Sequence, residues 1–187
     1  MNATKISTVS SVFQNMLKVS LGALFLVVLN SCSSDSDSPV TVTPPVASGT
    51  TAPEFSLTSL DSKTVKLSDY KNKVVTLFFF GNECPSCKAV GQKICMELGG
   101  AYATRTDYQI LGIDQWDGNA AKVLSFKTVT NIAFPLLLNG SSVAASYKTT
   151  YDRIVVIDKT GKIMFSGTQG ASSDIAAAKA KIDELLK

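Results

Sequence analysis

The sequence predicts an α/β domain built on a partly parallel β-sheet, and three observations lead to this fold class. Apolar runs of β-branched and aromatic residues alternate along the chain with segments of helical periodicity. Strands that alternate with helices are typical of sheets whose strands run parallel. Near the C-terminus, the turn at residues 159–162 separates two short apolar runs, which predicts a hairpin that adds an antiparallel edge to the sheet.

Seven apolar runs are expected to be strands, in chain order residues 54–57, 64–67, 74–80, 108–113, 134–138, 154–157 and 163–165. The first two would form an N-terminal β extension to a central mixed sheet flanked by helices, and residues 68–70 could begin a helical turn after them. Residues 74–80, VVTLFFF, are an unbroken run of β-formers, so we expect a strand that is buried on both faces. Residues 108–113, YQILGI, are expected to be the next buried strand.

Three longer segments have the pattern of helices. Over residues 85–98, three apolar residues recur at a spacing of four, namely Val90, Ile94 and Leu98. Residues 119–127 are expected to form the second helix. The third would begin with Ser172 or Ser173 as its N-cap and Asp174 in its first turn. Its inner face is expected to consist of four apolar residues: Ile175, Ala178, Ile182 and Leu185.

The segment before residue 52 is predicted to precede the folded domain, which would span residues 52–187. A basic start is followed by the apolar run VSLGALFLVVL at residues 19–29, which is shorter than the about 20 residues that a membrane span requires. This pattern predicts a secretory signal over residues 1–31. Residues 32–51 are rich in Ser, Thr and Pro and contain two acids and no base, so they are expected to be a disordered tether.

The end of this signal, Leu29-Asn30-Ser31-Cys32, resembles the lipobox of bacterial lipoproteins. In that motif the cysteine is acylated and becomes the new N-terminus. The resemblance therefore implies a lipid anchor at Cys32 and a location in the bacterial cell envelope, at the periplasmic face or the outer membrane. Each buried CH₂ group of an acyl chain contributes about 0.8 kcal/mol, which would hold the protein on a membrane. The alternative is a hydrophobic leader whose cysteine is incidental.

Composition limits the chemistry that the chain can perform. The 187 residues include no histidine, which excludes Ser-His-Asp and Cys-His catalysis and any metal site that needs imidazole. The formal net charge is +3, and removal of Lys5 and Lys18 with the signal leaves 16 basic and 15 acidic residues. Nothing in this balance calls for nucleic acid as a partner. The chain has too few cysteines for a disulfide scaffold: Cys32, Cys84, Cys87 and Cys95.

Cys84, Pro85, Ser86 and Cys87 form a CxxC motif between the predicted strand at residues 74–80 and the helix that follows. If Cys84 is the N-cap, Pro85 occupies the first helical position, where a missing N–H has no cost. The unpaired N–H groups of Ser86 and Cys87 then point to the Cys84 sulfur. Together with the helix dipole they lower the pKa of the Cys84 thiol. The motif predicts that Cys84 exchanges with a disulfide and that Cys87 resolves the mixed disulfide.

A structural staple and a metal clip are the alternatives to redox exchange. A disulfide across so short a loop removes little chain entropy, about 2 kcal/mol in the loop-closure model. A metal site needs a second pair of ligands, and among soft ligands the domain has only Cys95 left. Neither a metal nor a cofactor is therefore expected, and an inert remnant of the motif stays open. Cys95 would lie about 16 Å along the helix from Cys84 and is expected to be a buried small hydrophobe.

Four segments carry a family resemblance. They are APEF at residues 52–55, LSDY at 67–70, the CxxC motif and IDKTGK at 157–162, in this order. Together they resemble the thioredoxin-like superfamily, in its branch of redoxin (AhpC/TSA) proteins and TlpA/ResA-like envelope thiol-disulfide oxidoreductases. The resemblance covers residues 52–187 and implies a thioredoxin-like fold. It also implies dithiol–disulfide exchange with Cys84 as nucleophile, with protein thiols or disulfides and an upstream electron donor as partners.

Two positions depart from the pattern of the disulfide oxidoreductases. Members of the family have a cis-proline just before the strand that ends in ID, but the three residues at this place are Tyr151, Asp152 and Arg153. The missing proline would change how substrates dock and how the thiols are shielded. Glu83 stands where tryptophan is usual, and it would raise the pKa of Cys84 by repulsion, relay a proton, or lie solvated in the loop. Trp116 could supply aromatic surface nearby or lie in the core or rim.

An AhpC/TSA-type thiol peroxidase that uses Cys84 is the alternative function. Peroxidase members keep a Thr or Ser three residues before the peroxidatic cysteine, and here this residue is Gly81. They also bring an arginine close to the thiolate. Arg153 is the candidate for this role, and a surface ion pair with Asp152 is its alternative. A non-catalytic binding module on the same fold is the third hypothesis.

Overall fold

The computed structural model describes residues 47–187. The predicted signal at residues 1–31, the lipid attachment at Cys32 and most of the predicted tether lie outside these residues. None of the helices formed by residues 47–187 has the length and apolar content that a membrane span requires.

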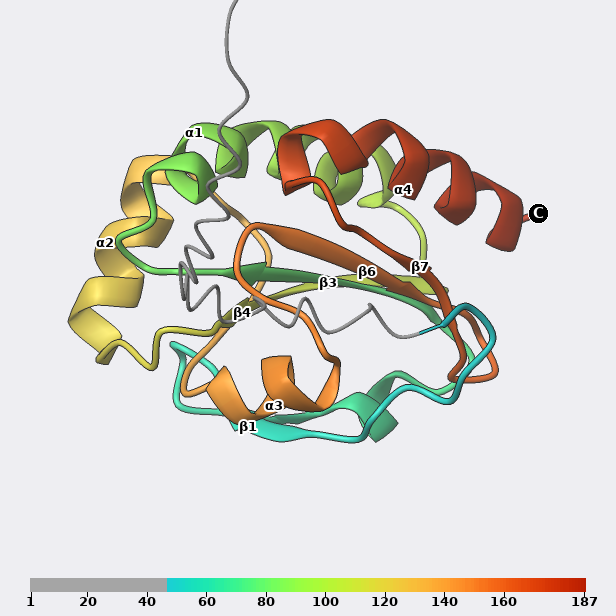
Figure 1. Ribbon diagram of the computed structural model, residues 1–187, viewed down its shortest axis with the longest axis horizontal. Coiled ribbons are helices and arrows are strands. Elements are labelled where there is room, and N and C mark those ends of the chain that lie inside the picture. The colour runs from blue at the N-terminus through green and yellow to red at the C-terminus, as the bar shows by residue number, and fades with distance from the viewer. Residues whose placement is uncertain (1–46) are drawn as a thin grey trace, which may run out of the picture. The chain divides into compact units, whose positions relative to one another are not determined.

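A five-stranded mixed sheet forms the centre of the domain (Figure 1). Its strands, from one edge to the other, are β5 (Leu136–Leu137), β4 (Tyr108–Asp114), β3 (Val74–Phe80), β6 (Arg153–Ile157) and β7 (Ile163–Ser166). β4 runs parallel to β3 and β5, whereas β6 is antiparallel to β3 and β7. The predicted mixed sheet with an antiparallel edge hairpin is therefore confirmed.

Four α-helices cover the two faces of this sheet, namely α1 (Pro85–Ile94), α2 (Ala120–Thr130), α3 (Ser141–Ser146) and α4 (Ala171–Leu185). In Figure 1, α1 and α4 lie over one face, and α3 lies over the other. Side chains of α2 join those of α1 and α4 in a single hydrophobic core. The arrangement is a three-layer domain with the sheet in the middle.

The central strand β3 is buried along its whole length, as its unbroken apolar run predicts. Its alternate residues belong to two different cores, because side chains of a strand point to opposite faces. Phe78 and Phe80 pack with α1, α2 and α4, and the ring of Phe80 stacks on Phe126 with centroids 4.3 Å apart. Leu77 and Phe79 pack on the face covered by α3. The strand is thus fixed on both sides up to the residue where the CxxC loop begins.

An N-terminal extension precedes the sheet, as predicted. It is a hairpin of β1 (Ser56–Thr58) and β2 (Thr64–Lys66), followed by a 3₁₀ turn at Leu67–Tyr70. Backbone pairing begins before residue 52, because the Gly49 N–H donates to the Ile163 carbonyl and the Ile163 N–H donates to the Thr50 carbonyl. Gly49 and Thr50, which belong to the segment expected to be a tether, are therefore paired with the edge strand of the sheet.

The helices differ from the sequence-based expectation in four places, one of which is that α2 ends at Thr130 instead of residue 127, whereas the strand bounds agree within two residues. The expectation that Ser172 or Ser173 caps α4 is wrong: Gly170 is the N-cap, and its φ of +102° suits glycine. α1 ends at Ile94, and the chain continues through a π-helical turn at Cys95–Gly99. α3 was not expected, because its sequence SSVAAS is too short to show a helical period.

Candidate active site

The CxxC motif lies where β3 ends and α1 begins, at the carboxyl edge of the central parallel strands. Cys84 is the N-cap residue of α1 and has an extended backbone, and Pro85 follows as the first helical residue. The Cys84 N–H donates to the Gly81 carbonyl over 3.0 Å, which closes the turn between strand and helix. The predicted placement of the motif on the fold is therefore confirmed.

The sulfurs of Cys84 and Cys87 lie within bonding distance and form a disulfide, with Cα atoms 5.3 Å apart. Of the two predicted backbone donors to the Cys84 sulfur, the N–H of Cys87 is found, over 3.2 Å, whereas the hydrogen bonds at this sulfur do not include the N–H of Ser86. The hydroxyl oxygen of Ser86 lies 3.2 Å from the same sulfur. The first turn of α1 therefore provides hydrogen-bonding groups that would stabilise a Cys84 thiolate once the disulfide is reduced.

Both sulfurs belong to buried residues. Only 1% of Cys84 and none of Cys87 is exposed, whereas the two residues between them, Pro85 and Ser86, are exposed. The two cysteines thus differ in exposure by only this single percent.

Glu83, directly before Cys84, is exposed and forms an ion pair with Lys122 of α2. The carboxylate Oε2 and the Lys122 Nζ are 2.9 Å apart, and the hydrogen bond and charge of Lys122 lower the pKa of Glu83. The group is thus an exposed acid that is paired with a lysine. This agrees with the alternative of a solvated acid in the loop. Lys122 also offsets the repulsion that Glu83 would exert on a Cys84 thiolate.

Trp116 and Tyr151 form an aromatic pair beside the loop that leads to Cys84. Their ring centroids are 5.1 Å apart in an edge-to-face arrangement. Trp116 lies directly against Gly81, because a Cβ atom at this glycine would be 2.5 Å from two carbons of the indole. In the folded domain, 43% of Trp116 and 39% of Tyr151 remain exposed. Of the alternatives for Trp116, the structure thus agrees with aromatic surface at the rim near the motif and not with a core position.

The place of the family's cis-proline has an unusual backbone in this chain. Asp152, directly before β6, has a left-handed φ of +58°. Its carbonyl accepts the N–H of Ala171 over 2.9 Å and the Arg153 guanidinium over 2.8 Å. The Arg153 guanidinium thus bonds to the Asp152 backbone rather than forming the ion pair with the Asp152 carboxylate that was one of its two sequence-based alternatives. A cavity of about 200 Å³ beside Asp152 is lined by Ser86, Ala89, Val90, Lys93 and Ser172.

Asp114, the last residue of β4, was missed by the sequence analysis. It is completely buried, and its carboxylate accepts five hydrogen bonds. The donors are the backbone N–H groups of Asn82, Trp116 and Gly118 and the side-chain amide of Asn82. An acid directly after a buried apolar strand was the available signal, but such acids are mostly exposed turn residues.

Cys95, the third cysteine in the described residues, is free and partly buried. Its sulfur accepts the N–H of Ala133 over 3.4 Å. It lines an apolar cavity of about 250 Å³ together with Ile110 and Phe134, so it packs among hydrophobic neighbours. Within residues 47–187, no three or more His, Cys, Asp or Glu side chains are grouped as a metal ion would require.

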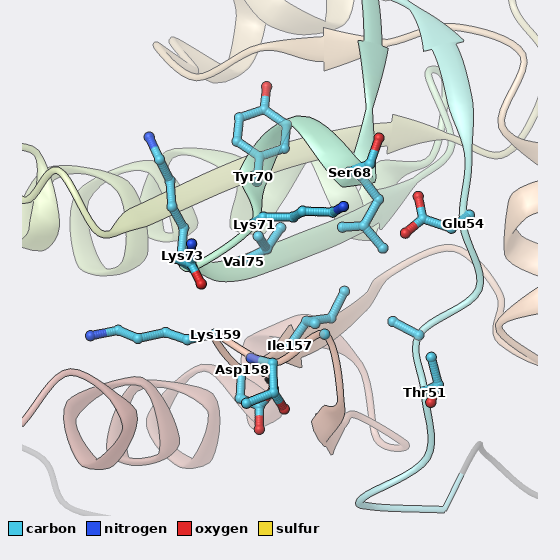
Figure 2. Close-up of a pocket in the computed structure, with 15 residues that line it drawn as sticks. Thr51, Glu54, Ser68, Tyr70, Lys71, Lys73, Val75, Ile157, Asp158 and Lys159 are labelled. Atoms are coloured by element: carbon cyan, nitrogen blue, oxygen red, sulfur yellow. Dashed lines mark hydrogen bonds between the residues drawn. The ribbon is translucent and has the colours of Figure 1, made fainter.

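Figure 2 shows a separate cleft of about 380 Å³, whose lining includes Val75 near the start of β3, whereas the cysteines follow the end of this strand. Charges of both signs line it, including Lys71, Lys73, Asp158 and Lys159. Lys159 is paired with Asp107, and the Asp158 carboxylate is occupied by N–H groups of its own hairpin turn. The described lining of this cleft includes no cysteine.

Comparison with known sequences points to redox proteins. A model described as the AhpC/TSA family matches residues 48–166. The chain is similar to the thioredoxin-like protein YneN of Bacillus subtilis, with 27% identity over 120 residues, which cover 63% of this chain and 69% of YneN. It is also similar to the thiol-disulfide oxidoreductase ResA of Bacillus cereus, with 29% identity over 118 residues, 62% of this chain and 66% of ResA. Each match spans about two thirds of the relative's length.

Comparison with solved structures agrees with the comparison of sequences. A protein from Bacteroides thetaiotaomicron, proposed to be a protein disulfide isomerase, superimposes with a TM-score of 0.69 and 32% identity. The match covers 75% of this chain and 91% of that protein. The thioredoxin-like fold that the sequence predicts is therefore confirmed.

Proposed function

Because the chain belongs to the AhpC/TSA family and has a thioredoxin-like fold, we propose that it is a thiol-disulfide oxidoreductase. Its Cys84–Cys87 pair would exchange with thiols and disulfides of other proteins. The names of its relatives, a thioredoxin-like protein and a thiol-disulfide oxidoreductase, support this activity. The observation that carries the proposal is the position of the Cys84 sulfur at the N-cap of α1, 3.2 Å from the N–H of Cys87.

In the reducing direction, the Cys84 thiolate attacks one sulfur of a substrate disulfide. A bond forms between Cys84 and that sulfur, and the other substrate sulfur leaves as a thiolate that takes up a proton. Cys87, after losing its proton, attacks the Cys84 sulfur, releases the second substrate thiol and closes the Cys84–Cys87 disulfide. Two electrons pass from the protein to the substrate. A dithiol donor restores the pair by the same steps in reverse.

The first turn of α1 gives the two cysteines different roles. In the reduced protein, the N–H of Cys87 and the helix dipole lower the pKa of the Cys84 thiol, so Cys84 is the attacking sulfur. Cys87 lies one turn inside the helix and resolves the mixed disulfide. Pro85 begins the helix at a position that needs no donor, and Ser86 places its hydroxyl beside the Cys84 sulfur. Glu83 and its ion pair lie at the rim.

Reduction of insulin disulfides by a dithiol reductant tests this activity. The wild-type protein should accelerate the reduction, Cys84→Ser should abolish the acceleration, and Cys87→Ser should accumulate a mixed disulfide at Cys84. Cys95→Ser is the matched control, because Cys95 is free and lies outside the motif. It should keep the wild-type rate. An unchanged rate in Cys84→Ser would contradict the proposal.

We also propose that Cys32 carries a lipid and tethers the domain to the bacterial cell envelope. The support is the lipobox-like sequence before Cys32 and the polar, proline-rich segment at residues 32–51, which would separate the anchor from the domain. Expression of the full chain in bacteria supplied with a labelled fatty acid tests this. The label should purify with the wild-type protein and be absent from Cys32→Ser; labelling of both would contradict it.

A thiol peroxidase is the second candidate, because the matching family model is that of AhpC/TSA proteins. Two residues weigh against it. Gly81 offers no hydroxyl, and the guanidinium of Arg153 is bonded to the Asp152 carbonyl. Consumption of hydrogen peroxide in the presence of a dithiol donor distinguishes the two functions. Only a peroxidase would consume the peroxide faster than the donor alone does, and it would lose this faster rate in Cys84→Ser.

A non-catalytic binding module is the third hypothesis. It would keep its cellular role in Cys84→Ser and Cys87→Ser.

A further inference from the structure

Asp114 is a buried charged residue that the proposed exchange reaction does not use. No part of it is exposed, and it pairs on the sheet with Phe80, the last residue of the strand that leads to Cys84. Burial of a carboxylate is costly unless hydrogen bonds satisfy its oxygens. Its partners therefore indicate what the residue holds in place.

These partners belong to two different loops. Oδ1 accepts the backbone N–H of Asn82 over 3.2 Å and that of Trp116 over 3.3 Å, and Oδ2 accepts the N–H of Gly118 over 2.7 Å. The side-chain amide of Asn82 donates to both oxygens over 3.1 Å. Asn82 lies in the loop before Cys84, whereas Trp116 and Gly118 lie in the loop after β4. One carboxylate thus fixes the two loops against each other.

Little free space surrounds this network. Asn82 is 3% exposed, and a Cβ atom at Gly118 would collide with its amide. The turn that contains Asn82 is closed by the hydrogen bond from the Cys84 N–H to the Gly81 carbonyl. A displacement of Asn82 would therefore move the residues that set the position of Cys84.

We propose that Asp114 is a positioning residue for the dithiol: by holding Asn82, it keeps Cys84 opposite Cys87 and so sets the reduction potential of the pair. The inference rests on the proposed exchange function for its role in the reaction. An intramolecular disulfide is more stable when the effective concentration of one sulfur near the other is higher. A looser loop lowers this concentration, favours the dithiol and makes the potential less negative.

Three single variants test this positioning. Asp114→Asn keeps the shape of the side chain but turns one acceptor oxygen into a donor, so at least two of the five hydrogen bonds fail. Asn82→Ala removes only the side-chain amide and leaves the carboxylate with its three backbone donors. Asp158→Asn is the matched control, because this carboxylate also accepts backbone N–H groups, from Thr160 and Lys162, in a turn at the other end of the sheet.

The potential is measured by equilibrating the wild-type protein and each variant with glutathione redox buffers and counting alkylated thiols. Asp114→Asn is expected to shift the equilibrium about tenfold towards the dithiol, which is about 30 mV for a two-electron couple. Asn82→Ala should shift it about threefold in the same direction. Asp158→Asn should stay within about twofold of the wild type, although it lowers the melting temperature.

The proposal would be overturned if the dithiol–disulfide equilibrium constants of Asp114→Asn and Asn82→Ala stayed within about twofold of the wild-type constant. An equal shift of this constant in Asp158→Asn would also overturn it. If Asp114→Asn does not fold, Asn82→Ala decides, since it keeps the carboxylate and its backbone donors. Failure of the proposed function gives a different result. The wild-type protein would then not accelerate insulin reduction, whereas the shifts among the variants would still be measured.

Discussion

Replacement of Gly81 by alanine tests how the loop before Cys84 is packed. A Cβ atom at this position would lie 2.5 Å from two indole carbons of Trp116 and 2.9 Å from a third, which is closer than carbon atoms can approach. Because Trp116 is 43% exposed, its ring can swing outwards instead of compressing the core. Overpacking of this kind costs about 1–3 kcal/mol, and we expect Gly81→Ala to lower the free energy of unfolding by this amount.

Urea denaturation measures this loss, and tryptophan fluorescence measures the displacement of the ring, since Trp116 is the only tryptophan in the chain. A double-mutant cycle isolates the collision. In the Gly81→Ala/Trp116→Ala variant the new methyl group meets no indole, so this variant should be more stable than the two single losses predict. The expected coupling is about 0.5–3 kcal/mol.

Gly100→Ala is the matched control for this experiment. Gly100 has a right-handed helical backbone, and a Cβ atom there meets only the Cys95 carbonyl, at 3.6 Å. The free energy of unfolding of Gly100→Ala should equal that of the wild type or be higher by about 0.4–1 kcal/mol. The reasoning is refuted if Gly81→Ala has wild-type stability and fluorescence, or if the losses of Gly81→Ala and Trp116→Ala simply add.

Three further predictions concern the thiol, a surface charge and the core. Titration of thiolate absorbance in the reduced protein should give Cys84 a pKa below the about 8.5 of a free cysteine. Arg105 and Lys159 hold the pKa of Asp107 well below its usual range, so this carboxylate stabilises the fold above about pH 4, and the stabilisation is lost as the pH falls through the lowered pKa. Asp107→Asn should therefore lower the melting temperature at neutral pH and have less effect near pH 2. Phe126→Ala, which removes a fully buried ring, should lower the free energy of unfolding in urea by about 3–5 kcal/mol.

Each of these predictions has a contradicting outcome. A Cys84 thiol that titrates like a free cysteine would show that the first turn of α1 does not stabilise its thiolate. An equal effect of Asp107→Asn at both pH values would mean that its contribution is not electrostatic. A loss below about 1 kcal/mol in Phe126→Ala would contradict the tight packing of this ring on the sheet.

The parts of the fold that can be predicted from the sequence are those determined by interactions between residues close together in the chain. The strand Val74–Phe80 follows from its own composition, and the position of Cys84 at a helix N-terminus follows from Pro85 and the helical period after it. The hairpin at residues 159–162 is set by its own turn residues. In each case the deciding interactions lie within a few residues of the signal, so no knowledge of the tertiary structure is needed.

The parts that could not be predicted depend on contacts between distant segments. The role of Asp114 requires that two loops after parallel strands meet, and Asn82 is 32 residues away from it in the chain. Gly170, not a serine, caps α4, and the Ala171 N–H at the start of this helix bonds to the Asp152 carbonyl 19 residues earlier in the chain, a contact that the local preference for serine does not reveal. The ion pair of Glu83 with Lys122 likewise depends on where α2 begins. The pattern of apolar and polar residues along the sequence does not specify such contacts between distant segments.

The burial of Cys84 makes the first turn of α1 decisive for any exchange reaction. A thiolate loses solvation when it is buried, and this effect alone raises the pKa of a thiol and suppresses the attacking form. With 1% of Cys84 exposed, water cannot compensate for this loss. The compensation must come from the N–H of Cys87, the hydroxyl of Ser86 and the helix dipole, which act only while the sulfur stays at the N-cap. The loop contacts that hold Cys84 on this turn would therefore also support a reactive thiolate.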